Sequence, residues 1–189
     1  MKVLFPILVI LAGIITAHAQ QEASAKNMDS VLRAKKQVVL NKPFPQFIAK
    51  SEDGLVSNDL LQNKVVLINF WFEGCHPCME EMAMLNELHR GFKDNKDFLF
   101  ISFTFDDEEA IQRVKEKHQP TFSILSTSQT ECARLNFNSG YPTTIILDKK
   151  GVVRYIHNVL YDVNLLDYKK GKYTDLLRTA MSSEVRGLL

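Results

Sequence analysis

Two patterns of apolar residues, a continuous run and then a helical spacing, mark the middle of the chain. Residues 64–72, "KVVLINFWF", are β-branched and aromatic without polar alternation, which predicts a strand covered on both faces. Four apolar residues at spacings of three and four then follow Cys78: Met82, Leu85, Leu88 and Phe92. Such a stripe is typical of an amphipathic helix. The pattern therefore predicts a central strand, a turn that contains "CHPC", and a helix.

The rest of the chain alternates between strand and helix patterns. Four more strands are predicted: Phe98–Phe105, Thr121–Leu125, Thr143–Leu147 and Val152–Asn158. Three more helices are predicted: Asp107–Lys117, Ser128 to about Asn136, and about Asn164 to Ser182. The last two strands flank Asp148–Gly151, whose glycine suits a tight hairpin. This order predicts an α/β fold of three layers, in which a central mixed β-sheet is flanked by helices.

The N-terminus has the pattern of a signal peptide. Lys2 precedes an apolar or small stretch of 13 residues, Val3–Ile15, and residues 17–19, "AHA", supply the small side chains that a signal peptidase needs. We predict cleavage after residue 19 and export to the periplasm or another extracytoplasmic compartment. The alternative is an uncleaved anchor, but the stretch is shorter than the roughly 20 residues that span a bilayer. Residues 20–40 are expected to form a lead-in with a short helix near Met28–Lys35, and residues 41–189 one domain.

Composition and charge narrow the class of function. With 46% hydrophobic residues the chain can bury one sizeable core, and no Pro/Gly-rich linker or internal repeat indicates a second domain. The formal net charge of +1 falls to zero when Lys2 leaves with the signal peptide, so nothing indicates nucleic acid as a partner. Three cysteines are too few and too odd in number for a disulfide framework, and two of them share one CxxC. This usage favours redox chemistry.

The CHPC turn has the features of a reactive pair of thiols. Pro77 suits the first turn of a helix, which places Cys75 at or just before the helix N-terminus. The N–H groups and the dipole at that end stabilise a thiolate and lower a cysteine pKa from about 8.5 to roughly 3.5–7.5. We therefore assign Cys75 as the attacking thiol and Cys78, one turn into the helix, as the resolving thiol. His76 and Pro77, which lie between them, are expected to tune the redox potential.

Other interpretations of CHPC are weaker. A structural zinc site needs four ligands, and the chain has no second CxxC and no His pair at ligand spacing. Covalent haem attachment needs His directly after the second Cys, where Met79 stands. A permanent disulfide across CxxC encloses only two residues and would stabilise the fold little. We expect no metal and no cofactor apart from the redox-active disulfide of Cys75 and Cys78.

Three segments, "VVLINFWFEGCHPC", "GYPTT" and "ILDKKGVV", resemble the thioredoxin fold, and more closely the exported thiol-disulfide oxidoreductases of the TlpA/ResA type. The resemblance runs from about Asn41 to the C-terminal helix. It implies a cis peptide bond at Pro142, which, with Tyr141 before it, would face the active-site turn and contact the backbone of a substrate. It also implies an extra βα insertion between Cys78 and Pro142, to which residues from about 98 to 117 are expected to contribute.

Three positions bear on how far the resemblance extends. Asn69 stands where thioredoxin has a buried Asp, and Asn cannot take up a proton. ResA-like proteins have an acid three residues after the second Cys, and Glu81 has this position, so the resemblance implies that Glu81 exchanges protons with the thiols. The alternative is that Glu81 is an ordinary solvent-facing residue of the helix. Gly74 stands where most relatives have Trp, which would leave the surface beside Cys75 flatter.

The remaining reactive side chains are interpreted as structural. Cys132 lies in a short predicted helix far along the chain, where a buried, unreactive thiol is the expected state. His89, His118 and His157 are expected at the surface or as hydrogen-bonded residues of the core.

The resemblance implies an enzyme that exchanges dithiols and disulfides with client proteins, as a reductase kept reduced by a membrane thiol electron carrier. Two rivals remain. A thiol peroxidase needs Thr three residues before its reactive Cys, where Phe72 stands. A copper-carrying thioredoxin fold would use the two cysteines and a distant His such as His157, but the cysteines of that family are three residues apart rather than two.

Overall fold

The computed structural model describes residues 36–158 and 173–189. The chain divides into two compact units, Met1–Val38 and Val39–Leu189, and the fold described below is that of the second. The predicted signal peptide, the helix expected near Met28–Lys35 and residues 164–172 of the predicted closing helix lie outside the described residues. Within the described ranges, no helix is long and apolar enough to cross a membrane.

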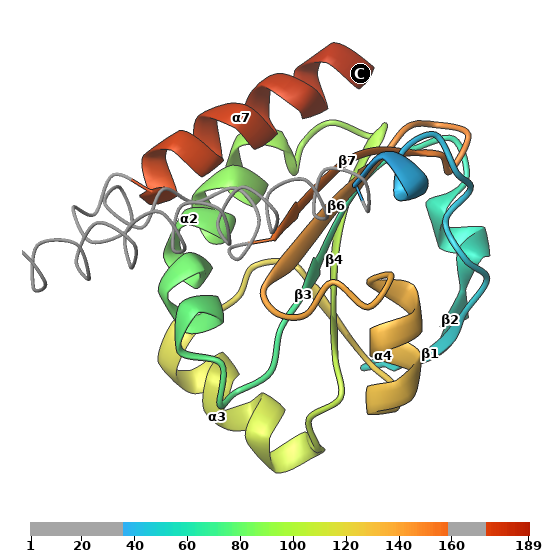
Figure 1. The fold of residues 1–189 in the computed structure, drawn as a ribbon. Helices are drawn as coiled ribbons and strands as arrows, with labels where there is room; N and C mark the ends of the chain where they lie inside the picture. Colours follow the sequence, from blue (N-terminus) through green and yellow to red (C-terminus); the bar gives the residue numbers. More distant parts are fainter. Residues whose placement is uncertain (1–35, 159–172) are drawn as a thin grey trace, which may run out of the picture. The chain divides into compact units, whose positions relative to one another are not determined.

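Seven strands of the described chain form one mixed sheet in the order β2-β1-β5-β4-β3-β6-β7 (Figure 1). β3 (Val65–Phe70) lies between β4 (Phe98–Thr104), which runs parallel to it, and β6 (Thr143–Leu147), which runs antiparallel. β5 (Ser123–Ser126) is parallel to β4, and β7 (Val153–Asn158) forms a hairpin with β6. All six residues of β3 are buried, which confirms the predicted central strand.

Helices cover both faces of this sheet (Figure 1). α2 (His76–Phe92), α3 (Glu108–His118) and α7 (Tyr173–Leu188) share a core with one face. The short helix α4 (Gln129–Leu135) and the 3-10 helix η1 (Asn58–Leu61) share a second core with the other face. The predicted three-layer α/β arrangement with a mixed sheet is confirmed.

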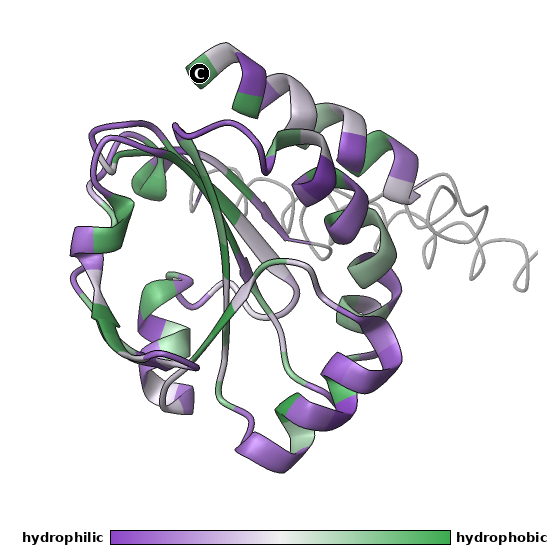
Figure 2. Cartoon of the chain, turned by 180° about the vertical axis from the view of Figure 1, so that it is seen from behind, coloured by the Kyte–Doolittle hydropathy of each residue, from purple (hydrophilic) through white to green (hydrophobic). Residues whose placement is uncertain are grey.

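β3 contributes to both cores because its side chains alternate between the two faces of the sheet. Val65 and Leu67 belong to the core with α2 and α7, whereas Val66 and Ile68 belong to the core with α4. Figure 2 shows the central strands as mostly hydrophobic and α3 as mostly hydrophilic. Full burial of one aliphatic side chain contributes about 1.5–3 kcal/mol to the stability of the fold. Because all six residues of β3 are buried, the strand is held firmly and supports the turn that follows it.

Local signals in the sequence set the ends of several elements. The side chain of Asp107 accepts a hydrogen bond from the N–H of Ala110 at 2.9 Å and begins α3. The hydroxyl of Ser128 accepts one from the N–H of Glu131 at 3.2 Å and begins α4. Gly151 has a φ of 74° in the turn between β6 and β7, the left-handed region that a glycine adopts without strain.

A hairpin at the edge of the sheet has no counterpart among the predicted strands. β1 (Ile48–Ser51) and β2 (Gly54–Ser57) pair antiparallel, and β1 also pairs with β5. Each of these strands has only four residues; in β1 Ala49 is buried, and the other positions of both strands are exposed or partly buried. Neither strand therefore has the long apolar run or the alternation of apolar and polar residues by which a strand is found in a sequence.

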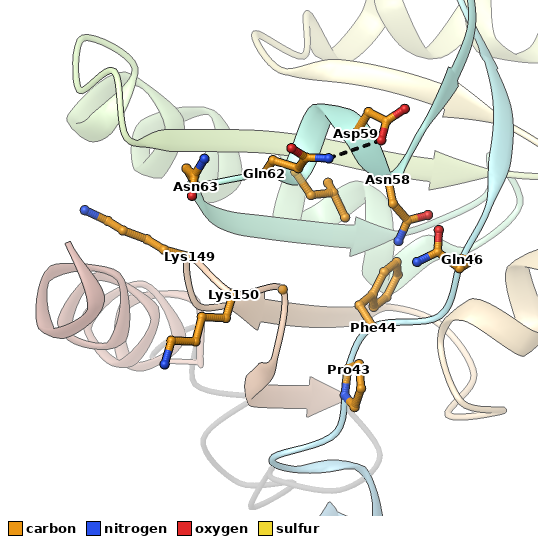
Figure 3. A pocket seen from close by; sticks show the side chains of 11 residues that line it. Pro43, Phe44, Gln46, Asn58, Asp59, Gln62, Asn63, Lys149 and Lys150 are labelled. Atoms are coloured by element: carbon orange, nitrogen blue, oxygen red, sulfur yellow. Dashed lines mark hydrogen bonds between the residues drawn. The ribbon is translucent and has the colours of Figure 1, made fainter.

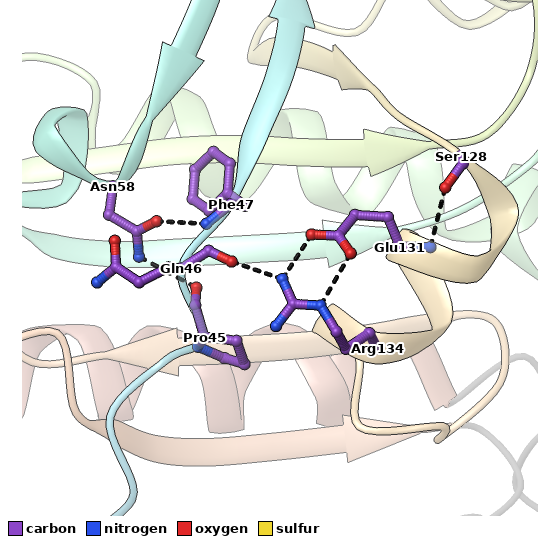
Figure 4. Close-up of polar contacts among 7 residues, drawn as sticks. All are labelled: Pro45, Gln46, Phe47, Asn58, Ser128, Glu131 and Arg134. Carbon is purple, nitrogen blue, oxygen red and sulfur yellow. Dashed lines mark hydrogen bonds and ion pairs between the residues drawn. The ribbon is translucent and has the colours of Figure 1, made fainter.

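Polar contacts tie the segment before β1 to the elements beside it (Figure 4). The side chain of Asn58 accepts a hydrogen bond from the N–H of Phe47 at 2.7 Å and donates one to the carbonyl of Pro45 at 3.1 Å. Arg134 of α4 donates to the carbonyl of Gln46. The approach to β1 is thereby fixed from η1 on one side and from α4 on the other.

The closing helix ends later than predicted. Its described part, α7, continues past Ser182 to Leu188. Met181 and Val185 are fully buried against the core of α2 and β3, so the apolar stripe of the helix extends a full turn beyond the predicted end.

β4 and β5 bear on two further predictions. β5 begins at Ser123 rather than Thr121. Residues 98–117, which are expected to contribute to an added insertion, form β4 and most of α3, and β4 is paired with β3 on one side and with β5 on the other. Their contribution to an insertion stays a prediction.

Candidate active site

The CHPC segment lies where β3 ends and α2 begins. Cys75 is the N-cap of α2, and its Sγ accepts a hydrogen bond from the N–H of Cys78 at 3.3 Å. Pro77 lies in the first turn of the helix, where a missing N–H costs nothing and the fixed φ favours the helix. The predicted place of Cys75 at the helix N-terminus is confirmed.

Cys75 and Cys78 form a disulfide, with Cα atoms 5.3 Å apart. Both residues are largely covered: Cys75 is 6% exposed and Cys78 only 1% exposed. The small opening is therefore on the side of Cys75. This difference matches the order in which the sequence assigns the attacking and the resolving thiol.

Glu81 is buried one turn beyond Cys78 on the same helix. Its exposed fraction is 1%, so the alternative of a solvent-facing residue is wrong. Residues three apart on a helix share a face, which directs Glu81 and Cys78 toward the same buried side of α2. Burial, opposed by a hydrogen bond from Tyr173 and assisted by the nearby charge of Glu80, raises the pKa of the Glu81 carboxyl to about 7. A carboxyl with this pKa can gain and lose a proton near neutral pH.

Tyr173 and His157 complete the surroundings of Glu81, and no pattern in the sequence predicted that these side chains meet. The hydroxyl of Tyr173, at the start of α7, donates to Oε1 of Glu81 at 2.6 Å. Nε2 of His157, on β7, lies 2.8 Å from the same hydroxyl. His157 is 5% exposed and Tyr173 is 8% exposed. His157 is thus a hydrogen-bonded core residue, as expected. Its partner Tyr173 also donates a hydrogen bond to Glu81, the candidate proton acceptor.

The peptide bond between Tyr141 and Pro142 is cis, as the resemblance implied. The ring of Tyr141 meets the ring of Phe72, three residues before Cys75, at 5.3 Å between centroids, and that of Phe105 at 5.6 Å. The cis proline segment and the turn with the cysteines are therefore neighbours through these aromatic contacts. The buried hydroxyl of Tyr141 lies beside the thiol of Cys132, and burial, together with that thiol, raises the pKa of Tyr141.

The turn between β3 and α2 is held from the loop after β4. The N–H of Glu73 donates to Oδ2 of Asp106 at 2.6 Å. The Glu73 carboxylate accepts two hydrogen bonds from the Arg113 guanidinium, each of 2.7 Å. The bond with Arg113 lowers the pKa of Glu73, and burial raises the pKa of Asp106. These two contacts position the residue two places before Cys75, and they were not predicted.

Three other residues singled out in the sequence lie outside this cluster or serve the core. His76 is exposed at 82% of its side chain, with Nδ1 3.4 Å from Oε1 of Glu80. Asn69 is buried and donates to the hydroxyl of Thr144 at 3.0 Å. Cys132 is fully buried, and burial raises the pKa of its thiol to about 12, which agrees with an unreactive thiol.

The pocket drawn in Figure 3 lies at the other end of the sheet. Its volume is about 330 Å³, and Phe44, Asn58, Gln62 and Lys149 are among its lining residues. Lys149 follows β6, whose residue Leu147 pairs with Val66 at the start of β3, whereas the cysteines follow the end of β3. Among the described residues, no group of three or more His, Cys, Asp or Glu side chains is arranged to hold a metal ion.

Known proteins are similar in sequence to most of the described chain, including the segment with the two cysteines. The model of the AhpC/TSA family matches residues 40–156. The thioredoxin-like protein YneN of Bacillus subtilis (strain 168) is 34% identical over 116 residues, which cover 60% of this chain and 68% of that protein. The thiol:disulfide interchange protein DsbE of Haemophilus influenzae is 26% identical over 157 residues, which cover 82% of this chain and 84% of that protein.

Solved structures agree with the sequence comparisons. A putative protein disulfide isomerase from Bacteroides thetaiotaomicron has a TM-score of 0.64 and 19% identity, covering 79% of this chain and 89% of that one. A thiol-disulfide oxidoreductase from Bacteroides fragilis NCTC 9343 has a TM-score of 0.56 and 27% identity, covering 71% and 99%. The fold is thioredoxin-like, as predicted, and the predicted class of thiol-disulfide oxidoreductase is that of the relatives.

Proposed function

We propose that this protein exchanges dithiols and disulfides with client proteins outside the cytoplasm through Cys75 and Cys78. The chain belongs to the AhpC/TSA family, and similar proteins are named thiol-disulfide oxidoreductase or thiol:disulfide interchange protein. The clients are proteins that carry an accessible disulfide or thiol pair. The net direction that we propose is reduction of the client, with a membrane thiol electron carrier as the source of electrons.

The observation that carries this proposal is the hydrogen bond from the N–H of Cys78 to Sγ of Cys75 at the start of α2. In the reduced protein the same donor and the helix dipole would act on a Cys75 thiolate, which is the nucleophile in disulfide exchange. The greater exposure of Cys75, 6% against 1% for Cys78, supports the assignment of Cys75 as the residue that a client meets first.

The exchange has two steps that together move two electrons. The Cys75 thiolate attacks one sulfur of a client disulfide, so that a mixed disulfide forms and the other client sulfur leaves as a thiolate. Cys78 then loses its proton and attacks Sγ of Cys75, so that the internal disulfide forms and the second client sulfur leaves. The client is reduced, the enzyme is oxidised, and two electrons and two protons from the donor restore the dithiol.

Glu81 is the acceptor that we propose for the proton of Cys78. It is buried on the same face of α2, and its pKa of about 7 makes both of its protonation states accessible at neutral pH. Tyr141 and Pro142 are proposed to receive the backbone of the client next to Cys75, which the contact between the rings of Tyr141 and Phe72 supports. Redox tuning by His76 and Pro77 is part of the same proposal.

Trapping of mixed disulfides in cells tests the assignment of the two thiols. Cys78→Ser removes the resolving thiol, so we expect client proteins to accumulate on Cys75 and to be identified by mass spectrometry after non-reducing electrophoresis. Cys75→Ser is the matched control and should trap few proteins, and Cys132→Ser should leave the pattern unchanged. Equal trapping by Cys75→Ser and Cys78→Ser would show that the attacking and resolving thiols are wrongly assigned.

The redox state in growing cells tests the proposed direction. A reductase should be found mainly as the dithiol, which after acid quenching and denaturation takes three labels of a maleimide of large mass, at Cys75, Cys78 and the free Cys132. Loss of the membrane electron donor should convert it to the disulfide, which takes one label, at Cys132. A protein found as the disulfide in otherwise unperturbed cells would be an oxidant of its clients instead.

A further inference from the structure

Glu81, Tyr173 and His157 come from three elements that are far apart in the sequence, yet two hydrogen bonds that share the Tyr173 hydroxyl connect them. Tyr173 on α7 donates to Glu81 on α2 at 2.6 Å, across 92 residues of sequence, and the same hydroxyl lies 2.8 Å from Nε2 of His157 on β7. All three side chains are more than nine-tenths buried. A buried row of hydrogen-bonded groups is expensive to desolvate unless every member is satisfied, and the thiol exchange described above does not require it.

We propose that these residues form a proton relay, in which the hydroxyl of Tyr173 moves the proton that Glu81 takes from Cys78 on to His157. This inference rests on the proposed function of Glu81. Tyr173 and His157 are positioning residues in this scheme, since neither contacts a reacting sulfur in the contacts described.

The transfer is balanced and needs no other reactant. In one state the Glu81 carboxylate accepts from Tyr173, and N–H of the His157 imidazolium donates to the oxygen of Tyr173. In the other state Glu81 is protonated and donates to Tyr173, and the Tyr173 hydroxyl donates to the neutral nitrogen of His157. The two differ only by one proton passed along two hydrogen bonds, because a hydroxyl can donate and accept at the same time. The histidine can adopt either role, since each ring nitrogen can donate or accept.

The charged and titratable groups around Glu81 are compatible with this transfer. Glu80 on the same helix raises the pKa of Glu81, as burial does more strongly, and the bond from Tyr173 lowers it. α7 contributes Tyr173, which contacts Glu81 directly, and β7 contributes His157, which contacts Tyr173. α3, which also packs on α2, meets it at Asn86, whose amide donates to the carbonyls of His118 and Gln119. Removal of the Tyr173 hydroxyl should therefore raise the pKa of Glu81 further.

The test isolates the step of Cys78 and needs no client protein. The reduced enzyme is mixed with a nitrobenzoate disulfide, which releases one coloured thiolate when Cys75 attacks and a second when Cys78 closes the internal disulfide. We expect Tyr173→Phe to slow the second phase about tenfold at neutral pH and to move its pH midpoint up by about one unit, since a hydrogen bond to a charged group is worth about this much. The first phase should be unchanged.

Two further variants separate a relay from simple fixation of Glu81. His157→Gln can still donate an amide N–H to Tyr173 but cannot take up a proton, so we expect it to slow the second phase several-fold. Tyr155→Phe is the matched control, because Tyr155 lies on the same strand and its ring stacks on His157 at 6.5 Å; it should behave as the wild type.

The possible outcomes either support or overturn the relay. If His157→Gln has the rate and midpoint of the wild type while Tyr173→Phe does not, Tyr173 only fixes Glu81 and the relay is wrong. If Tyr173→Phe slows both phases equally, the link to Cys78 is wrong. Failure of the proposed function is recognised separately: the two phases and their response to the variants would remain, but no client would be trapped by Cys78→Ser.

Discussion

Glu81 experiences an environment that its neighbours on α2 do not share. Its carboxyl is 1% exposed, and burial disfavours the charged form because water no longer solvates it. Glu80, one residue earlier, is exposed at nearly half of its side chain and lies near the exposed ring of His76. Two adjacent acids therefore have different chemical properties, and only the buried one is suited to exchange protons with a thiol at neutral pH.

The raised pKa of Glu81 predicts how the stability of the oxidised protein depends on pH. Between the ordinary value of 4.5 and about 7 the folded protein holds a proton that the unfolded chain has released. The free energy of unfolding should therefore fall as pH rises through this range, by about 3 kcal/mol from this group. Glu81→Gln should lack this fall, while Glu80→Gln should retain it. Urea unfolding at a series of pH values measures the difference, and parallel curves for wild type and Glu81→Gln would contradict it.

His76 predicts a change in redox potential. An imidazole N–H beside Cys75 favours the thiolate and hence the reduced form, because the disulfide has no thiolate to stabilise. We expect His76→Gly to lower the potential by about 30 mV, a tenfold change in the equilibrium constant, within the range from about −270 to −180 mV. A glutathione redox titration measures it. An equal or higher potential for His76→Gly would show that the histidine does not stabilise the thiolate.

The turn between β3 and α2 is an element held at both ends. β3 is buried on both faces, Cys75 is the N-cap of α2, and Glu73, one of the four residues between Phe70 and Cys75, is held by the loop after β4. The N–H of Glu73 has its hydrogen bond to Asp106 in a half-buried position, whereas the ion pair between Glu73 and Arg113 faces solvent. A loop fixed in this way keeps Cys75 in register with the helix N-terminus without a bound ligand.

These two contacts should differ in their effect on stability. Asp106→Ala leaves the N–H of Glu73 without its acceptor, so we expect a loss of about 1–3 kcal/mol in the free energy of unfolding. Arg113→Ala removes a solvent-exposed ion pair and should have a much smaller effect. Chemical denaturation of both variants provides the comparison. Equal losses, or a larger loss for Arg113→Ala, would show that the exposed pair holds the turn.

At the scale of the whole molecule, the reacting atoms and the pocket of Figure 3 lie at opposite ends of β3. The cysteines, the cis proline segment and the Tyr173–Glu81 contact lie together where β3 ends. The sheet thus brings segments that are as far apart in the sequence as residues 72 and 173 to one end of β3. The core between the helices and the sheet holds them there.

Export is the prediction that concerns the chain as a whole. If residues 1–19 are a cleaved signal peptide, the protein recovered from outside the cytoplasm should begin at Gln20. N-terminal sequencing or intact mass of the mature protein measures this. Substitution of Ala19 by a bulky residue should block cleavage and leave the longer form attached to the membrane fraction. A protein that begins at Met1 and is found in the cytoplasm would contradict the proposed compartment.

Local patterns of the sequence determined a large part of this protein. The apolar run of β3, the stripe of α2, the caps at Asp107 and Ser128 and the proline in CHPC are each set by residues a few places apart, and each predicts its element or its chemistry. The pairing of Cys75 with Cys78 and the likeness of "GYPTT" to a cis proline segment also followed from the sequence alone.

The features that only the tertiary structure decided depend on residues far apart along the chain. The pattern left open whether Glu81 faces water or the core, and burial against α7 settles it. Its partner Tyr173 is 92 residues away, and Asp106 reaches Glu73 across 33 residues. Such contacts arise from packing of the sheet and helices, which no short-range pattern encodes.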